Sequence, residues 1–395
     1  MDLSLTEPER QFALEVRSWL EANVEVAPDT DDLAASVAWG RAWQARLAAA
    51  HWVGINWPEE YGGRGASPVE VAIFNAEYAR SGAPQLVNRV GINLAGPTLL
   101  AHGTPEQCRR WLPAIVSAEE IWCQLFSEPG AGSDLAGLVT RADPEAEAGD
   151  AERGGQGGGQ GGWRVSGQKV WTSYAQFARY GLCLARTEPG TTGPRGLSLL
   201  VVDMEAPGVE IRPLVQITGE AEFNEVFLDD VLVPADHLVG AAGQGWAVAS
   251  TTLAHERGTN FPFKEEVVHE GYLTRLVVEA ARNGTLDDPD VADALVDAYV
   301  ALVVLRTHNW RTLSKLARGE EPGPESSWVK LTWSNMTQQL SEAALAVEGA
   351  GSGLWGPWQR QWLWSKAASI AGGTSEVQRN VIGERILGLP REQRR

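Results

Sequence analysis

The residues of this sequence that could do chemistry gather around glycine-rich turns. One such stretch, AGGTSEVQRN, lies near the C-terminal end. Gly372 and Gly373 free the backbone there, and the hydroxyls of Thr374 and Ser375 can cap amide groups that a helix start leaves unpaired. The pattern predicts a turn that binds an anion or a carbonyl group. No side chain before Glu376 can take or give a proton, so an acid–base reaction needs a group from elsewhere.

Two other segments also combine glycine with hydroxyl side chains. SEPGAGSD, from Ser127 to Asp134, is a polar glycine-rich turn with two serines, and GQKVWTS, from Gly167 to Ser173, places an aromatic ring and two hydroxyls at the end of a predicted strand. Each segment alone is compatible with an ordinary turn, a strand with a core tryptophan or a helix cap. Their order along the chain, around a β-rich region, is what makes them specific together.

Several other chemistries are not supported. The six histidines show no metal-binding spacing, and no G-x-S-x-G motif is present. Three cysteines are too few and too scattered for a disulfide framework or a zinc site, which favours a reducing compartment. A redox reaction would need a bound cofactor, because no side chain here accepts a hydride.

Two glycine clusters could be mistaken for phosphate sites. GGQGGGQGG, at 154–162, lacks the terminal Lys-Ser/Thr of a P-loop and is predicted to be a flexible hairpin loop. GAGSG, at 349–353, follows a helical run instead of a strand, which argues against a dinucleotide fingerprint.

The charge and hydropathy of the chain argue against some classes of binding partner. The chain of 395 residues carries a net charge of −18 without any Lys/Arg run, which argues against nucleic acid and anionic membrane surfaces. No apolar run approaches the ~20 residues that span a bilayer. The N-terminal stretch TEPERQF predicts a capped amphipathic helix, with Thr6 and Glu9 at capping-box spacing, and not a secretory signal. We therefore expect a cytoplasmic protein without membrane insertion.

The elements that must position these segments fall into three parts. Residues 1–122 show helical periodicity, with breaks at Trp57–Gly65 and around Gly96-Pro97, and residues 123–236 contain short β-rich runs such as WRVSGQKVWTS and FNEVFLDDVLV. Helical periodicity returns within residues 237–395. The pattern predicts an α+β chain with a β domain inserted between two helical domains.

With these segments in this order, the chain resembles the acyl-CoA dehydrogenase family along essentially its whole length. The resemblance implies an N-terminal α-helical domain, a central β-barrel domain and a C-terminal four-helix bundle. It also implies that FAD removes hydrogens from the α and β carbons of an acyl-CoA thioester, giving the trans-2-enoyl-CoA. The electrons would then pass to an electron-transfer flavoprotein.

The resemblance assigns cofactor contacts in the β region. Phe126 and Ser127 would face the pyrimidine edge of the flavin, and Ser133 would lie close to the FAD phosphates or the pantetheine arm of the substrate. Trp171 would stack beside the isoalloxazine ring, and Ser173 would hydrogen-bond flavin N5, the hydride acceptor. The alternative for Trp171 is an ordinary core tryptophan.

The resemblance also indicates where the catalytic base lies. Many relatives carry a glutamate directly before the Gly-Thr-Ser of the C-terminal turn, but Gly372 stands there in this chain, and only its N–H could polarise the thioester carbonyl. Some branches place the glutamate before an arginine on the helix that opens the C-terminal bundle, which corresponds to Glu256 and Arg257. We therefore expect Glu256 to be the base and Arg257 to lie near substrate or flavin; the alternative is a surface ion pair. Thr374 and Ser375 would contact FAD.

One departure from the family leaves the assembly open. Many homotetrameric relatives have an Arg-x-x-Phe-Gly segment that reaches the FAD of a neighbouring subunit, and the corresponding stretch here, YLTRLVVEAARNGTLDDPDV, lacks it. A homo-oligomer (dimer or tetramer) and a heterotetramer both remain possible. So do a non-catalytic or half-site subunit of a heteromer, an acyl-carrier-protein-linked relative and an oxygen-using relative. Short, branched, long and steroid-side-chain acyl groups are all compatible with the sequence.

Overall fold

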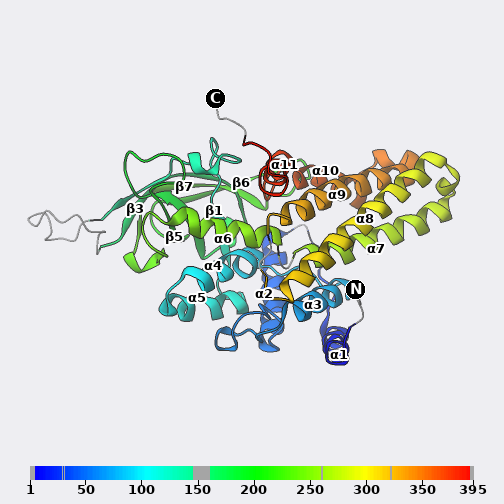
Figure 1. The fold of residues 1–395 in the computed structure, drawn as a ribbon, viewed down its shortest axis with the longest axis horizontal. Helices are drawn as coiled ribbons and strands as arrows, with labels where there is room; N and C mark the ends of the chain where they lie inside the picture. The colour runs from blue at the N-terminus through cyan, green and yellow to red at the C-terminus, as the bar shows by residue number, and fades with distance from the viewer. Residues whose placement is uncertain are drawn as a thin grey trace, which may run out of the picture. The chain divides into compact units, whose positions relative to one another are not determined.

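The computed structural model describes residues 5–28, 30, 32–145, 161–258, 261–320 and 323–391 (Figure 1). Its internal contacts divide the chain into two compact units. The helical unit comprises Met1–Val26, Ala66–Ala83 and Glu256–Arg395, and the sheet unit comprises Ala27–Gly65 and Pro84–His255. The expected α+β architecture of N-terminal helices, a central β domain and C-terminal helices is confirmed. The boundaries after residues 122 and 236 remain predictions.

The helical unit is built from long amphipathic helices. They are α1 (Glu7–Asn23), α3 (Pro68–Arg80), α7 (Phe261–Asn283), α8 (Pro289–Leu316), α9 (Ser326–Glu348), α10 (Pro357–Ala368) and α11 (Ser375–Val381). The predicted capping box at the start of α1 is present, since the backbone N–H of Thr6 donates to the Glu9 carboxylate at 2.6 Å. This contact fixes the helix start where the sequence placed it.

The core of the helical unit lies among α7, α8, α9 and α10. Each helix contributes one apolar stripe, for example Leu295, Leu302 and Leu305 from α8 and Met336 and Leu340 from α9. Spacing of this kind buries a continuous face, which supplies most of the stability of helices in a protein.

The sheet unit surrounds its strands with shorter helices. The helices are α2 (Leu33–Ala49), α4 (Gly96–His102), α5 (Pro105–Ser117) and α6 (Gly245–Gly258), whose last turn belongs to the helical unit. The strands are β1 (Trp122–Leu125), β2 (Arg141–Pro144), β3 (Trp163–Ser173), β4 (Tyr180–Arg186), β5 (Leu197–Asp203), β6 (Val209–Leu214), β7 (Phe223–Val233) and β8 (Leu238–Val239). The β-rich runs of the sequence are therefore strands.

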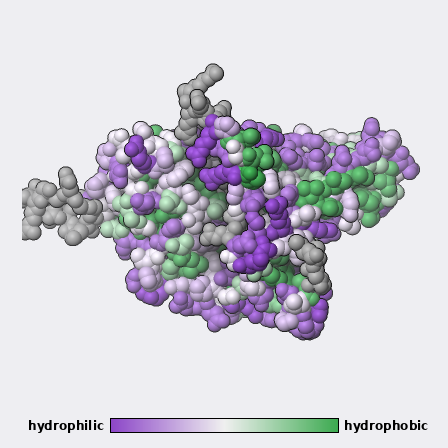
Figure 2. Space-filling model, viewed as in Figure 1, coloured by the Kyte–Doolittle hydropathy of each residue, from purple (hydrophilic) through white to green (hydrophobic). Residues whose placement is uncertain are grey.

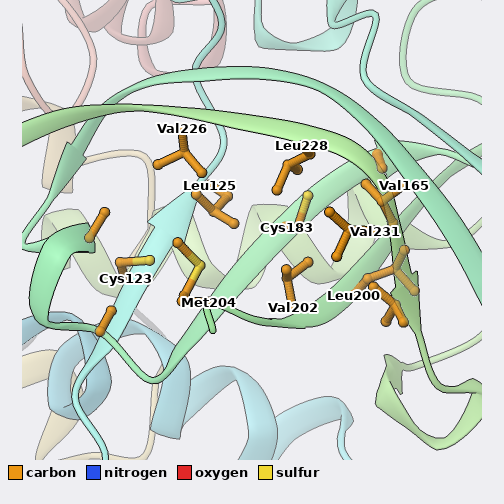
Figure 3. Close-up of a cluster of buried hydrophobic side chains, with 14 of the residues drawn as sticks. Cys123, Leu125, Val165, Cys183, Leu200, Val202, Met204, Val226, Leu228 and Val231 are labelled. Atoms are coloured by element: carbon orange, nitrogen blue, oxygen red, sulfur yellow. The ribbon is translucent and has the colours of Figure 1, made fainter. Parts of the chain in front are cut away.

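The strands form one sheet in the order β6-β7-β3-β2-β4-β5-β8, and β1 pairs in parallel with β4. Its inner face surrounds a core of small apolar side chains that includes Leu125, Cys183, Leu200, Val226 and Val231 (Figure 3). Strands far apart in the sheet order thus share one core. β1 and β3 are held at fixed positions by this packing, and these are the strands that lead to the predicted cofactor contacts.

The prediction of a helical break around Gly96-Pro97 is wrong, because the chain stays helical there. A π-helical turn, Gly91–Ala95, leads directly into α4, so the chain changes helix type without leaving the helix. Pro97 lies in the first turn of α4, where its missing N–H is tolerated.

The two glycine clusters of the sequence lie between β2 and β3 and directly after α9. The glycine-rich loop expected at 154–162 lies almost entirely outside the described residues, although β2 and β3 on either side of it pair antiparallel. GAGSG forms a 3-10 turn, Gly349–Gly353, directly after α9, as its helical context predicted. Within the described ranges, no helix is both long and apolar enough to cross a membrane.

Candidate active site

The end of β1 is tied to β3 at the residues predicted to meet the flavin. The carbonyl of Ser127 accepts a hydrogen bond from the backbone N–H of Val170 at 2.9 Å. Phe126, just before it, is buried with 4% of its surface exposed, and Ser127 is half-buried. The structure therefore brings Ser127 beside the strand segment that carries Trp171.

A β-bulge in β3 decides the direction of Trp171. Trp163, Val165 and Lys169 follow the alternation of the strand on its buried face, and strict alternation would place Trp171 there as well. The register against β7 shifts between Lys169 and Thr172, and Trp171 takes φ +59°. The bulge turns Thr172 inward and leaves Trp171 62% exposed, with its ring edge-on to Phe223.

Beneath this surface lies a buried ion pair that sequence reasoning overlooked. The Lys169 ammonium is fully buried and donates to the Glu128 carboxylate at 2.9 Å, to the Phe126 carbonyl at 3.2 Å and to the Leu184 carbonyl at 2.8 Å. One lysine thus joins β3 to β4 and to the residue after β1. The signal available in the sequence was a lysine at an inward position of an apolar strand, which requires a buried partner.

Glu128 completes this arrangement. Its carboxylate also accepts hydrogen bonds from the backbone N–H groups of Val139, at 2.7 Å, and Thr140, at 3.0 Å. Burial by itself raises the pKa of the Glu128 carboxyl, but the Lys169 ammonium and these hydrogen bonds outweigh burial, and the net effect lowers the pKa. The Glu128 carboxyl is therefore ionised at neutral pH, and its hydrogen bonds to Val139 and Thr140 close the loop that contains Ser133.

The remaining predicted residues of the sheet unit differ in exposure. Ser133 is exposed on the loop that follows the tight turn from Glu128 to Ala131. Ser173 is half-buried as the last residue of β3, where it pairs with Phe223. Both lie on the segments that the Lys169–Glu128 pair holds.

In the helical unit, the glycine-rich turn has the expected form. Gly372 and Gly373 adopt φ +67° and +94°, a backbone region that favours glycine. The Thr374 hydroxyl caps α11 by accepting from the Val377 N–H at 3.2 Å, as predicted. Ser375 is buried, and its backbone N–H donates to the Ser369 carbonyl at 3.0 Å.

A second overlooked residue, Gln378, fixes this turn. Its side chain is fully buried, and its Nε2 donates to the carbonyls of Gly372 and Gly373, each at 3.2 Å. Its Oε1 is also buried and has no hydrogen-bond partner among the described residues. A polar residue facing inward from the first turn of α11 was the sequence signal.

The candidate base lies on α6. Glu256 and Arg257 belong to the last turn of this helix, as expected, but their side chains lie outside the described residues. Glu376, the nearest acid to the glycine turn in sequence, is exposed and pairs with Arg379 at 3.3 Å on the surface of α11. This i,i+3 ion pair stabilises α11, which indicates a structural role for Glu376.

Three family models match consecutive parts of the chain. The acyl-CoA dehydrogenase N-terminal domain matches residues 6–119, the middle domain matches 123–231 and the C-terminal domain matches 243–387. The chain belongs to the acyl-CoA dehydrogenase family. It is accordingly an oxidoreductase with acyl-CoA dehydrogenase activity.

Relatives and solved structures agree with this assignment. The chain is 43% identical to the acyl-CoA dehydrogenase IpdE1 of Mycobacterium tuberculosis over 97% of its own length and 98% of that protein. It is similar to the Tcur3481–Tcur3483 steroid ACAD, with a TM-score of 0.83 and 26% identity over 99% of this chain and 100% of that one. It is also similar to the ChsE4–ChsE5 complex of Mycobacterium tuberculosis, with a TM-score of 0.82 and 30% identity over the full length of both chains.

Acyl-CoA dehydrogenases use FAD, and the residues of the sheet unit suit an aromatic cofactor. A tryptophan that is 62% exposed and held at positive φ by a bulge offers a rigid plane for stacking. Ser127 lies two residues after the end of β1, Ser173 is the last residue of β3, and both residues are half-buried. The alternative of a core role for Trp171 is excluded by its exposure.

The described side chains offer neither an exposed thiol nor a cluster of metal ligands. Cys108, Cys123 and Cys183 are buried free thiols, and burial raises the pKa of all three, that of Cys183 to about 11. Among the described side chains, no group of three or more His, Cys, Asp or Glu residues could hold a metal ion.

Proposed function

We propose that this acyl-CoA dehydrogenase binds FAD and converts an acyl-CoA thioester to the trans-2-enoyl-CoA. The observation that carries the proposal is the exposed ring of Trp171, which the β3 bulge turns away from the core. Exposing a large aromatic ring on a strained backbone is unfavourable unless a ligand uses it.

The proposed FAD contacts are considered for each unit by itself. In the sheet unit, Phe126, Ser127, Ser133, Trp171 and Ser173 are proposed to hold the cofactor, with the Ser127 and Ser173 hydroxyls and the main-chain amides as hydrogen-bond donors. In the helical unit, Thr374 and Ser375 are the proposed contacts. When bound, FAD supplies a hydride acceptor at its N5 atom.

Acid–base chemistry is assigned to the end of α6 and the glycine turn. The Glu256 carboxylate would take the proton from the substrate α carbon while the β carbon loses hydride, so that a C=C bond forms between them. The Gly372 N–H would donate to the thioester oxygen, where negative charge develops as the proton leaves. Ser133 and Arg257 are the proposed contacts to the rest of the thioester.

We further infer a steroid-derived acyl group as the substrate class and a related subunit in the working assembly. The support is likeness along nearly the whole chain to a structure described as a steroid ACAD and to the ChsE4–ChsE5 complex. An electron-transfer flavoprotein is the proposed acceptor of the electrons.

The test is a visible spectrum of the purified chain before and after anaerobic addition of steroid-side-chain and straight-chain acyl-CoAs. Flavin colour that bleaches with the steroid thioester supports the proposal. A colourless protein points to a half-site or non-catalytic subunit, and a flavin that bleaches only with straight chains overturns the steroid assignment.

Glu256→Gln tests the base. We expect flavin to stay bound while the bleaching rate falls by about 10²–10⁴, the usual contribution of a general base. Glu376→Gln is the matched control, because it removes an exposed carboxylate close to the glycine turn in sequence and should leave the rate unchanged. A wild-type rate in Glu256→Gln would remove Glu256 from the mechanism.

A further inference from the structure

The end of β3 lies between two residues with a strained backbone. Trp171 and Tyr174 adopt φ +59° and +55°, in the left-handed region that favours glycine. Between them lie only Thr172 and Ser173, the last two residues of the strand. Backbone strain of this kind persists where the surrounding contacts enforce it. The contacts made by Thr172 and Ser173 therefore decide where the Trp171 ring and the Ser173 hydroxyl point.

Asn224, the second residue of β7, supplies such a contact. It pairs with Thr172 across the sheet, and its Nδ2 donates to the Thr172 carbonyl at 3.0 Å and to the Gln176 Oε1. A longer bond of 3.4 Å reaches the carbonyl of Glu222. One amide group thus joins the peptide between the two strained residues to the turn that follows them and to the start of β7.

Two further hydrogen bonds extend this arrangement. The Gln176 Nε2 donates to the Ala221 carbonyl at 2.9 Å, and the backbone N–H of Tyr174 donates to the Glu222 carbonyl at 2.7 Å. Gln176 and Tyr174 are partly exposed, whereas Asn224 is fully buried. The end of β3 is therefore fastened to the start of β7, and Asn224 makes the contact that water cannot replace.

An asparagine at this position does not favour the stability of the sheet. The inward-facing positions of β7 that follow it, Val226, Leu228 and Val231, are apolar and belong to the sheet core. Figure 2 shows hydrophilic side chains over much of the visible surface, but Asn224 is fully buried. Its Oδ1 and the Thr172 Oγ1 are both buried without a hydrogen-bond partner among the described residues. Each unpaired atom costs stability, so an apolar pair would suit the sheet better.

We infer that Asn224 is a positioning residue for the flavin contacts of β3. Its hydrogen bond to the Thr172 carbonyl holds the end of the strand in its strained form, which keeps the Trp171 ring exposed and fixes the direction of the Ser173 hydroxyl. The inference rests on the proposed function, in which Trp171 and Ser173 contact FAD. Asn224 acts through the backbone of Thr172 and touches neither FAD nor substrate.

Hydrogen exchange of the chain without FAD tests the hold on the strand. We expect the Tyr174 amide to exchange at least about tenfold faster in Asn224→Val, because the segment opens more often when the side-chain donor is lost. Gln44→Leu is the matched control, since Gln44 is also fully buried in the sheet unit and donates to the carbonyls of Ile115 and Val116. It should leave the Tyr174 amide unchanged. Wild-type exchange in Asn224→Val overturns the inference.

FAD binding and flavin reduction test the consequence for the site. We expect Asn224→Val to raise the dissociation constant for FAD about tenfold, and Gln44→Leu to leave it unchanged. With FAD saturating, the limiting rate of reduction by whichever thioester class bleaches the wild type should fall about tenfold, while the half-saturating thioester concentration stays within about twofold. A general folding defect would not produce this division between rate and affinity, and melting temperatures of both variants check for one.

The outcomes separate this inference from the proposed function. Asn224→Ala, which removes the same donor with a smaller side chain, should repeat the results of Asn224→Val. Wild-type FAD affinity and reduction rate in both Asn224 variants overturn the positioning role and leave the proposed function standing. A wild-type chain that takes up no FAD overturns the proposed function, and the flavin role of Asn224 with it.

Discussion

Two buried side chains, one in each unit, hold main-chain segments that carry predicted site residues, and they do so differently. In the sheet unit, Lys169 is charged, needs the Glu128 carboxylate and joins segments far apart in the sequence. In the helical unit, Gln378 is neutral, makes weaker bonds at 3.2 Å and closes a turn only a few residues before it.

The difference follows from what each side chain must hold. The end of β1 is not part of a local turn, so its position relative to β3 and β4 has to come from a strong, long-range contact, and charged hydrogen bonds are about twice as strong as neutral ones. The turn at Gly372 is already closed by the Thr374 cap, so a neutral amide is enough. In both units, a buried side-chain donor thus fixes main-chain carbonyls next to the predicted site residues.

The largest expected effect is that of Lys169→Met. Removing the ammonium leaves the Glu128 carboxylate buried and unpaired, which should lower the free energy of unfolding by about 3–5 kcal/mol. Urea denaturation measures it. The double variant Lys169→Met/Glu128→Gln should recover much of the loss, because no buried charge remains. A single variant that loses less than about 1 kcal/mol would show that the Glu128 carboxylate does not need Lys169 as a partner in the folded state.

Gln378→Leu should lower the free energy of unfolding less than Lys169→Met does, and it should also lower the activity. We expect a loss of about 1–2 kcal/mol from two hydrogen bonds and a fall in kcat through displacement of the Gly372 N–H. Gln44→Leu is the matched control, because Gln44 is fully buried and its Nε2 donates to two consecutive carbonyls, of Ile115 and Val116, both at 3.1 Å. If both variants lose kcat equally, the positioning role of Gln378 is refuted.

Lowering the pH should weaken the Lys169–Glu128 ion pair and leave the hydrogen bonds of Gln378 intact. The folded pKa of Glu128 lies below its ordinary value of 4.5, so its contribution to stability is complete above that pH and is lost as pH falls through the folded pKa. The unfolding free energy of the wild type should therefore decrease more steeply below about pH 4.5 than that of Glu128→Gln. Parallel curves would mean that Glu128 is not coupled to folding, and Gln378→Leu should leave the slope unchanged.

The smallest effect concerns the backbone of the glycine turn. Gly372→Ala places a side chain at φ +67° and should cost roughly 1 kcal/mol in thermal or chemical unfolding. Gly271→Ala serves as a control of opposite sign, because Gly271 lies inside α7 with open space around it, and it should gain about 0.5–1 kcal/mol. A neutral Gly372→Ala would indicate that the turn adapts, and that Gln378 does not hold it tightly.

Local patterns were enough to predict much of this protein. The capping box at Thr6, the strand from Trp163 to Ser173 and the Thr374 cap all depend on residues close in sequence, whose conformational preferences act without the rest of the fold. The change from helical to β periodicity and back likewise gave the α+β architecture. The break expected at Gly96-Pro97 was wrong because a π-helical turn, Gly91–Ala95, leads directly into α4, which has Pro97 in its first turn.

Only the tertiary structure decided how the candidate site is supported. Strand alternation would have buried Trp171, and the bulge against β7 exposes it. Lys169 and Gln378 were present in the quoted motifs, but their roles depend on which carbonyls lie within reach after folding, and sequence spacing carries no such distances. Hydrogen bonds and ion pairs between distant segments exist only once a shared core, such as that of the sheet unit, has fixed those segments in space.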